Sequence, residues 1–348
     1  MLRRRLPFTR RHVAFLFVAL LAFAFFAPGR DVFAQPDTAA GPVPAGLWKL
    51  TPASNFVEGC FDPCMCPVLF HEALFGTLRM TPAPADAGFA VYDVTDLNWL
   101  VKGFEYWVTG SGTYRIGGQP LMHRLTLDLK VGDRVVEHYD SGLTPVGAST
   151  NAPEITIGIS KNNLVCHDTL FSVTMRPLVA QEIATYGLRQ SRYEEGCFGP
   201  CDCAVRAWPF IGRLGLVRLD GNGWGVGAST PADFGIVDLR GSVLDPATAT
   251  ANSGRPVLGG GLYHVDAATG RQQLRLDLLE NGAGPTRFDS GEVAWGGDLK
   301  RIDADVAANG FACNDRVYAI DARRKPRSDL ATESIRPDPY HPGAIPVP

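Results

Sequence analysis

The sequence predicts an all-β protein of two tandem antiparallel domains, each a β-sandwich or a barrel-like sheet with two disulfides. Three observations support this prediction. Short segments of alternating polar and apolar residues follow one another between turn residues, several motifs occur twice in the same order, and the eight cysteines form two matching sets of four.

The alternating segments have the length and composition of β-strands. They are rich in Val, Ile, Thr and aromatic residues, as in FAVYDV, EITIGIS and TLFSVTM, and Gly, Asp, Asn or Pro residues separate them. In the segment HRLTLDLKV, leucines at every second position define one inward face: Leu125, Leu127 and Leu129. About seven such strands per repeat, without long helical periodicity, favour a sandwich or a barrel. One short helix is expected over residues 181–189, between the repeats.

A tandem repeat defines the two domains. The motif EGCFDPCMCP at residues 58–67 returns as EGCFGPCDCA at residues 195–204, which is 137 residues later. Five further motifs return in the same order: GTLRM as GLVRL, GTY as GLY, LTLDL as LRLDL, YDSG as FDSG, and CHD as CND. A repeat of about 130 residues has the size of a domain rather than of a solenoid unit.

The repeat and the composition of the chain ends divide the sequence into six predicted regions. They are a signal peptide (1–34), a flexible leader (35–46), a first β-rich unit (47–178), a linker (179–191), a second β-rich unit (192–322) and a disordered, proline-rich tail (323–348). We call the two β-rich regions the first and the second unit.

The N-terminus has the three parts of an export signal. Residues 1–12 contain five arginines and no acid, residues 13–27 form an unbroken apolar run, and Val32-Phe33-Ala34 is a small-residue cleavage pattern. An uncleaved anchor is the alternative, but the apolar run is shorter than the roughly 20 residues of a membrane span. Arg10-Arg11 also matches a twin-arginine signal, which would change the export route. We expect a periplasmic, cell-envelope or extracellular protein whose mature chain has no membrane span.

The charge of the chain argues against nucleic acid as a partner. The formal net charge is -3, and removal of the signal peptide would take away six arginines and one aspartate. That leaves 27 basic and 35 acidic residues and a formal charge of −8. Because no basic stripe with interleaved aromatic residues is present, the sequence predicts no nucleic-acid binding, and it identifies no other partner.

The cysteines have the same spacing in both units. Each unit contains C-x3-C-x-C and then a single cysteine about 100 residues later. The first set is Cys60, Cys64, Cys66 and Cys166, and the second set is Cys197, Cys201, Cys203 and Cys313.

Disulfides are the favoured state of these cysteines, because an exported chain meets an oxidising compartment. A bond within C-x-C would be strained. We therefore expect one short bridge, either Cys60–Cys64 or Cys60–Cys66. One long bridge should join the remaining cysteine of the motif to Cys166, and the second unit should repeat the pattern with Cys313. Each long bridge would tie the start of a unit to its end.

Metal binding by the same cysteines is the alternative. Thiolates are suitable ligands for zinc or Cu(I). His71 and His167 lie near the cysteines of the first unit, but their counterparts in the second unit are Trp208 and Asn314. A site common to both units would therefore consist of cysteine alone. Because the spacing differs from that of zinc hairpins and a thioredoxin-like C-x-x-C is absent, the sequence favours disulfides without a cofactor; copper or zinc stays the alternative.

Two other groups of residues have a structural and a functional interpretation. His138, Asp140 and Ser141 have the residue types of a hydrolase triad, but alternation along a strand places Ser141 on the opposite face from the other two. We interpret Asp-Ser-Gly as a turn at the end of a strand. The second group is an aromatic cluster in the first unit, which consists of Trp99, Phe104, Tyr106 and Trp107. It would suit either a β core or a carbohydrate-binding platform, and we favour the core.

The cysteine motif resembles that of a group of uncharacterised exported bacterial proteins. They share an EGCxxPCxCPV opening, a GSGTY strand and a late DSG turn, which correspond to residues 58–68, 110–114 and 140–142. The second unit departs from this pattern, since Ala204 stands in the position of Pro67 and GGGLY replaces GSGTY. The resemblance implies export and agrees with the repeat boundaries, and it implies no activity.

Together these features predict an exported, disulfide-stabilised protein with a structural or binding role. Catalysis is disfavoured, because no set of residues has the spacing of a catalytic site. The alternative function is binding of copper or zinc by the two cysteine sets.

Overall fold

The computed structural model describes residues 43–64, 66–147, 153–201, 203–221, 226, 231–244 and 254–326. The predicted signal peptide, the leader up to residue 42 and the tail from residue 327 lie outside these residues.

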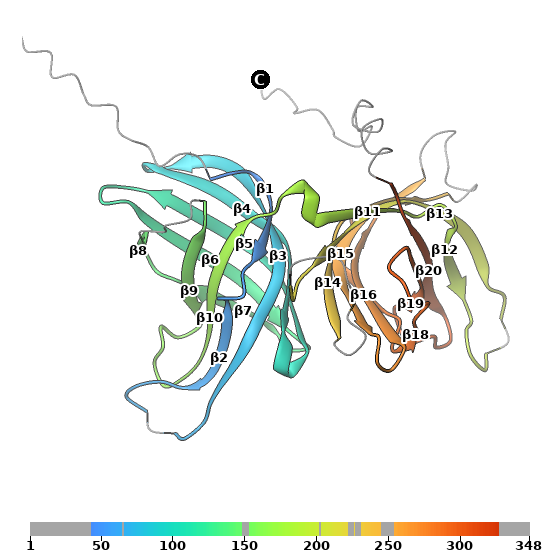
Figure 1. Ribbon diagram of the computed structural model, residues 1–348, viewed down its shortest axis with the longest axis horizontal. Helices are drawn as coiled ribbons and strands as arrows, with labels where there is room; N and C mark the ends of the chain where they lie inside the picture. The colour runs from blue at the N-terminus through green and yellow to red at the C-terminus, as the bar shows by residue number, and fades with distance from the viewer. Residues whose placement is uncertain are drawn as a thin grey trace, which may run out of the picture. The chain divides into compact units, whose positions relative to one another are not determined.

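The first unit is one antiparallel sheet of ten strands (Figure 1). Its strands are β1 (Gly46–Leu50), β2 (Asn55–Cys60), β3 (Leu69–Asp86), β4 (Phe89–Val101), β5 (Tyr106–Gly117), β6 (Met122–Val131), β7 (Val136–Asp140), β8 (Thr144–Pro145), β9 (Ile155–Ser160) and β10 (His167–Pro177). A 3₁₀ turn, η1 (Lys102–Phe104), joins β4 to β5. Each strand from β2 to β6 pairs with the one after it, β8 pairs with β6, β7 pairs with β9, β9 with β10, and β10 with β2. The sheet therefore closes on itself as a barrel.

The second unit repeats this order of pairing. Its strands are β11 (Ile183–Gly187), β12 (Ser191–Gly196), β13 (Arg206–Arg218), β14 (Ala232–Val243), β15 (Arg255–Asp266), β16 (Arg271–Glu280), β17 (Thr286–Asp289), β18 (Val293–Ala294), β19 (Arg301–Ala307) and β20 (Asp315–Arg324). The pairs β17–β19 and β20–β12 close the ring, as β7–β9 and β10–β2 do in the first sheet. The predicted all-β class with two antiparallel domains is confirmed, and the barrel-like alternative is the one observed.

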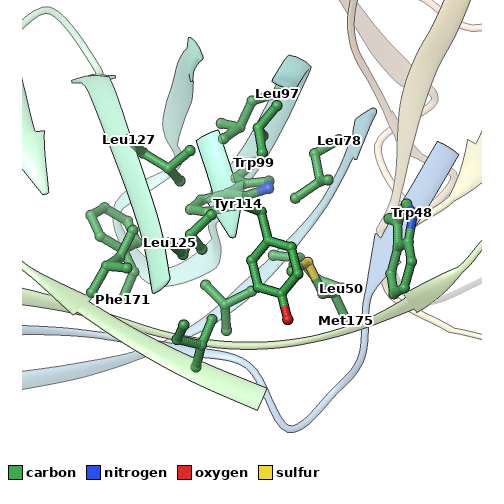
Figure 2. Packing of buried hydrophobic residues seen from close by; sticks show 14 of the residues in the cluster. Trp48, Leu50, Leu78, Leu97, Trp99, Tyr114, Leu125, Leu127, Phe171 and Met175 are labelled. Carbon is green, nitrogen blue, oxygen red and sulfur yellow. The ribbon is translucent and has the colours of Figure 1, made fainter. Parts of the chain in front are cut away.

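The core lies inside each closed sheet. Leu125, Leu127 and Leu129 are fully buried, so the predicted inward face of that strand is confirmed. The ring of Phe171 packs against three other aromatic rings of the first sheet; its centroid lies 5.2 Å from those of Phe56 and Tyr139 and 5.7 Å from that of Trp99. Figure 2 shows Phe171, Trp99, Leu125 and Leu127 in this cluster. Aromatic burial of this extent supplies much of the stabilisation of each sheet.

Each core also contains one buried polar pair at the same place. In the first sheet Tyr114 Oη lies 3.2 Å from His123 Nδ1, and in the second Tyr263 Oη donates to Gln272 Oε1 at 2.7 Å. Burial lowers the pKa of His123, so its imidazole is neutral near neutral pH, as the amide of Gln272 is. The pairs satisfy two tyrosine hydroxyls that would otherwise be buried without a partner.

The prediction of a short helix over residues 181–189 is wrong. A single 3₁₀ turn, η2 (Ala180–Glu182), is followed by strand β11, which pairs with β13 and β20. Ala184 and Tyr186, at alternate positions, are buried in the second core. Burial of every second residue therefore makes this segment a strand, because tertiary burial outweighs the local helix propensity of a short segment.

We expect Phe171→Ala to lower the free energy of unfolding by about 3–5 kcal/mol, because it leaves a cavity among three aromatic rings. Urea denaturation measures the change. The control is Val136→Ala at an exposed position, where the free energy should change by less than about 0.5 kcal/mol. A loss below about 1 kcal/mol for Phe171→Ala would contradict the packing described above.

Candidate functional site

Four disulfides lie at the loops that precede β3 and β10 in the first sheet and β13 and β20 in the second. Cys60 pairs with Cys66 and Cys64 with Cys166, with Cα–Cα distances of 5.7 and 4.8 Å. In the second sheet Cys197 pairs with Cys203 and Cys201 with Cys313, at 5.2 and 5.7 Å. Both sheets thus use the pattern in which the first and third cysteines of the motif form the short bridge. No described cysteine is free.

The glycine of the cysteine motif is required by a close backbone contact. A Cβ atom on Gly59 would lie 2.2 Å from the carbonyl oxygen of Val68, and one on Gly196 would lie 2.5 Å from that of Ala204. No side chain fits at such distances. The Glu-Gly-Cys opening therefore returns in both units because the two strands that flank the short bridge approach each other closely there.

The glutamate of the same motif has different partners in the two sheets. In the first, the Arg134 guanidinium donates to both carboxylate oxygens of Glu58, at 2.6 and 3.1 Å, and stacks on the ring of Tyr106. The hydrogen bond to Glu58 is the main cause that raises the pKa of Arg134. In the second, Glu195 accepts from Tyr193 Oη at 3.4 Å. The glutamate at the repeated position thus makes a local hydrogen bond in each sheet, with a different partner.

An aspartate two residues after the last cysteine organises the loop that carries it. The carboxylate of Asp168 is 1% exposed and accepts hydrogen bonds from the backbone amides of Lys161, Asn162, Leu164 and Thr169. Sequence reasoning assigned no role to this residue. The signal was present in the repeated CHD and CND motifs, where only the cysteine and the aspartate are shared.

The described cysteines do not form the thiolate ligand set that the metal alternative requires. A metal is bound by the thiolate, and every described cysteine is in a disulfide. Within the described ranges, no group of three or more His, Cys, Asp or Glu side chains is arranged to hold a metal ion. His71 and His167 are exposed. In the second sheet Asn314 Oδ1 lies 3.7 Å from Cys197 Sγ.

The residues of the candidate triad are not brought together as a triad. Ser141 Oγ accepts from the amide of Leu125 at 3.0 Å and donates to the carbonyl of Gly142 at 2.6 Å. His138 Nδ1 lies instead 2.8 Å from Asp128 Oδ1, and both side chains are exposed. Ser290 of the second sheet makes the equivalent bonds to Leu274 and Gly291. The structure supports the interpretation of Asp-Ser-Gly as a turn.

The aromatic cluster of the first unit does not form an exposed platform. Trp99 is fully buried in the first core, and Trp107 is 2% exposed. Trp107 packs with Leu100, Leu219 and Leu262 in a small apolar cluster, and its Nε1 donates to Asn98 Oδ1 at 3.2 Å. The side chain of Phe104 lies outside the described part of the structure. The two described tryptophans therefore serve packing.

Exposed apolar side chains lie close in the chain to the disulfides of the first sheet. They lie just before and at the start of β3, and on the loop before Cys166: Val68, Leu69, Phe70, Leu164 and Val165. They are 38–54% exposed, and sequence analysis did not single them out. Such grouping marks a surface that differs from an ordinary solvated loop.

No helix in the described ranges has the length and hydropathy needed to cross a membrane. Comparison of the chain with protein-family models, with curated proteins and with solved structures finds no match.

The Asp-Ser-Gly turn makes a prediction about pH. Asp140 accepts from Arg124 Nε at 2.9 Å and from the amide of Gly142 at 2.9 Å, and the bond to Arg124 is the main cause that lowers the pKa of Asp140 below 3.8. A lowered folded-state pKa means that the contribution of the carboxylate to stability is complete above pH 3.8. It is lost as the pH falls through the lowered value.

We therefore expect Asp140→Asn to lower the free energy of unfolding by about 1 kcal/mol at pH 7, because the ion pair is partly exposed. The difference from the wild type should shrink as the pH falls below 3.8. Denaturant titrations from pH 7 to pH 3 measure it, with Asp93→Asn at an exposed position as the control. A difference that grows on acidification would be the opposite of this expectation.

Proposed function

We propose that this chain is an exported protein that acts in the periplasm, the cell envelope or the extracellular space as a disulfide-stabilised, non-enzymatic structural or binding protein. The observation that carries the proposal is the pairing of all eight cysteines into four disulfides with the same pattern in both sheets. Disulfides persist in oxidising compartments and are rare in the cytosol.

Two further observations support a structural or binding role over catalysis. Ser141 of the candidate triad serves a turn, and five side chains close in the chain to the first pair of disulfides are apolar and exposed. Apolar exposed groups suit contact with another molecule better than acid–base chemistry, which needs titratable groups in a shared pocket.

The proposal includes descent from a duplicated unit and a relation to the exported bacterial proteins with the EGCxxPCxCP motif. The equal order of strand pairing in the two sheets and the repeated motifs support the duplication. The motif of the first unit supports the relation.

The state of the cysteines is tested by counting thiols in the natively purified chain. We expect no cysteine to react with an alkylating reagent under denaturing conditions before reduction, and eight to react after it. Peptide mapping should recover the four bridges described above. Elemental analysis of the same sample tests the copper or zinc alternative. Eight reactive cysteines before reduction, together with metal at about one ion per four thiols, would overturn the proposal in favour of that alternative.

Export is tested by the N-terminus of the chain recovered from a bacterial host that carries the complete sequence. We expect it to begin at Gln35, because the cleavage pattern ends at Ala34. The control is Leu20→Arg combined with Leu21→Arg, which breaks the apolar run and should leave a full-length chain in the cytoplasm. A wild-type chain that keeps residues 1–34 and stays in the cytoplasm would exclude the proposed location.

A further inference from the structure

We propose that Asp168 and Asp315 are positioning residues for oxidative folding, and that they determine which cysteines form the long disulfide of each sheet. The inference concerns how the bridges form, and it does not depend on where the protein acts. It rests on the hydrogen bonds of two buried carboxylates and on their place beside Cys166 and Cys313.

The carboxylate of Asp168 accepts hydrogen bonds from backbone amides on both sides of Cys166 in the loop before β10. Its Oδ1 and Oδ2 each accept from the amide of Asn162 at 3.0 Å, Oδ2 accepts from Leu164 at 2.7 Å, and Oδ1 accepts from Thr169 at 2.7 Å. Hydrogen bonds to an ionised, buried acceptor are the stronger ones in proteins. Cys166 lies inside the segment that these bonds fold back on itself, so its backbone is placed before any sulfur reacts.

The second sheet repeats these four bonds, although the loop sequence differs. The bond from the amide of Lys161 to Asp168 has no counterpart there, because the amide of Ala308 donates to the carbonyl of Arg316. Asp315 accepts from Asn309 with Oδ1 and Oδ2 at 2.9 and 3.1 Å, from Phe311 with Oδ2 at 2.8 Å, and from Arg316 with Oδ1 at 2.7 Å. The loops read KNNLVCHD and ANGFACND, and they share one asparagine, the cysteine and the aspartate. A carboxylate retained with these four shared bonds, two residues after each distant cysteine, indicates a role linked to that cysteine.

The ordered loop lies directly beside the cysteine motif. The amide of Phe61 donates to the carbonyl of Cys166 at 2.9 Å, His167 pairs with Cys60 across the strands, and Asp168 pairs with Gly59. Cys64 itself is held by a turn in which its amide donates to the carbonyl of Phe61 at 3.1 Å. Backbone hydrogen bonds therefore bring Cys166 and Cys64 together through Phe61.

Such placement is needed because the long bridge is disfavoured in an unstructured chain. Cys64 lies 102 residues from Cys166 but only four from Cys60. Loop-closure entropy favours the local pair by roughly a hundredfold. A structured loop removes this disadvantage, since it raises the effective concentration of the Cys166 thiol at Cys64.

The exchange chemistry leaves the carboxylate unchanged. With oxidised glutathione as the oxidant, the Cys64 thiolate attacks one sulfur, forms a mixed disulfide and releases one glutathione thiolate. The Cys166 thiolate then attacks the Cys64 sulfur and releases the second glutathione. Two protein thiols lose two protons and two electrons, and one glutathione disulfide becomes two thiols. Asp168 acts only by holding the second thiol within reach.

The test is oxidative refolding of the reduced full chain in a glutathione buffer, with the bridges mapped by mass spectrometry of peptides. In Asp168→Asn we expect the ratio of the Cys64–Cys166 bridge to the Cys60–Cys64 bridge to fall about tenfold, as the loss of one charge-assisted hydrogen bond would produce. The bridges of the second sheet should form as in the wild type. Asp315→Asn is the matched variant of the second sheet. In it the Cys201–Cys313 bridge should become rarer, and the bridges of the first sheet should form as in the wild type.

The control is Asp266→Asn, another aspartate whose side chain accepts from backbone amides in a turn, far in sequence from any cysteine. It should leave all four bridges unchanged. If Asp168→Asn forms the Cys64–Cys166 bridge with the wild-type ratio, or if Asp266→Asn perturbs the bridges equally, the proposal is wrong.

A second measurement covers the case in which Asp168→Asn does not fold. In the variant Cys64→Ser with Cys166→Ser, which keeps Asp168, the amides of Asn162 and Leu164 should stay protected from hydrogen exchange in the folded protein. Protection there shows that the carboxylate holds the loop in the absence of the bridge. Exchange at the rate of an open loop would overturn the proposal.

Discussion

Each sheet depends on the antiparallel pairing of a strand near its end with a strand near its beginning. In the first sheet β10 pairs with β2 from His167 opposite Cys60 to Ser172 opposite Asn55, and β20 pairs with β12 in the same way in the second. This contact closes the barrel and encloses the aromatic core. Pairs so distant in sequence carry a large loop-closure cost, and a disulfide and a buried carboxylate both lie beside this pairing.

The repeat made it possible to predict from the sequence that the cysteines form disulfides. The two matching sets of four cysteines predicted two bridges in each unit, and the structure contains them. The inward leucines followed from a period of two. The choice between Cys64 and Cys66 as the partner of Cys166 could not be predicted, because it depends on how the chain turns at Phe61 and on the carbonyl of Cys166.

Other features escaped sequence analysis for related reasons. A helix was expected where strand β11 lies, because five residues carry too weak a pattern to reveal that the second sheet will include them and bury Tyr186. Trp107 was expected to pack in a β core, but it lies in a separate small cluster with Leu219 and Leu262, and contacts between distant segments leave no local pattern.

The two cores contain different residues, although the two sheets have the same order of strand pairing. Tyr114 and Tyr263 keep a neutral polar partner, His123 in one and Gln272 in the other, so the core preserves the hydrogen bond rather than the residue.

The position of β1 has a consequence for the architecture of longer chains. Trp48 of β1 lies opposite Pro177 of β10, so the first sheet begins and ends at neighbouring points. The connection to the next sheet is then only the five residues from Leu178 to Glu182. A module whose ends meet in this way can be copied in series, moved into another loop or circularly permuted without opening its hydrogen-bonded ring. The number of barrels in such a protein is therefore free to change by whole modules, each bringing its own two bridges with it.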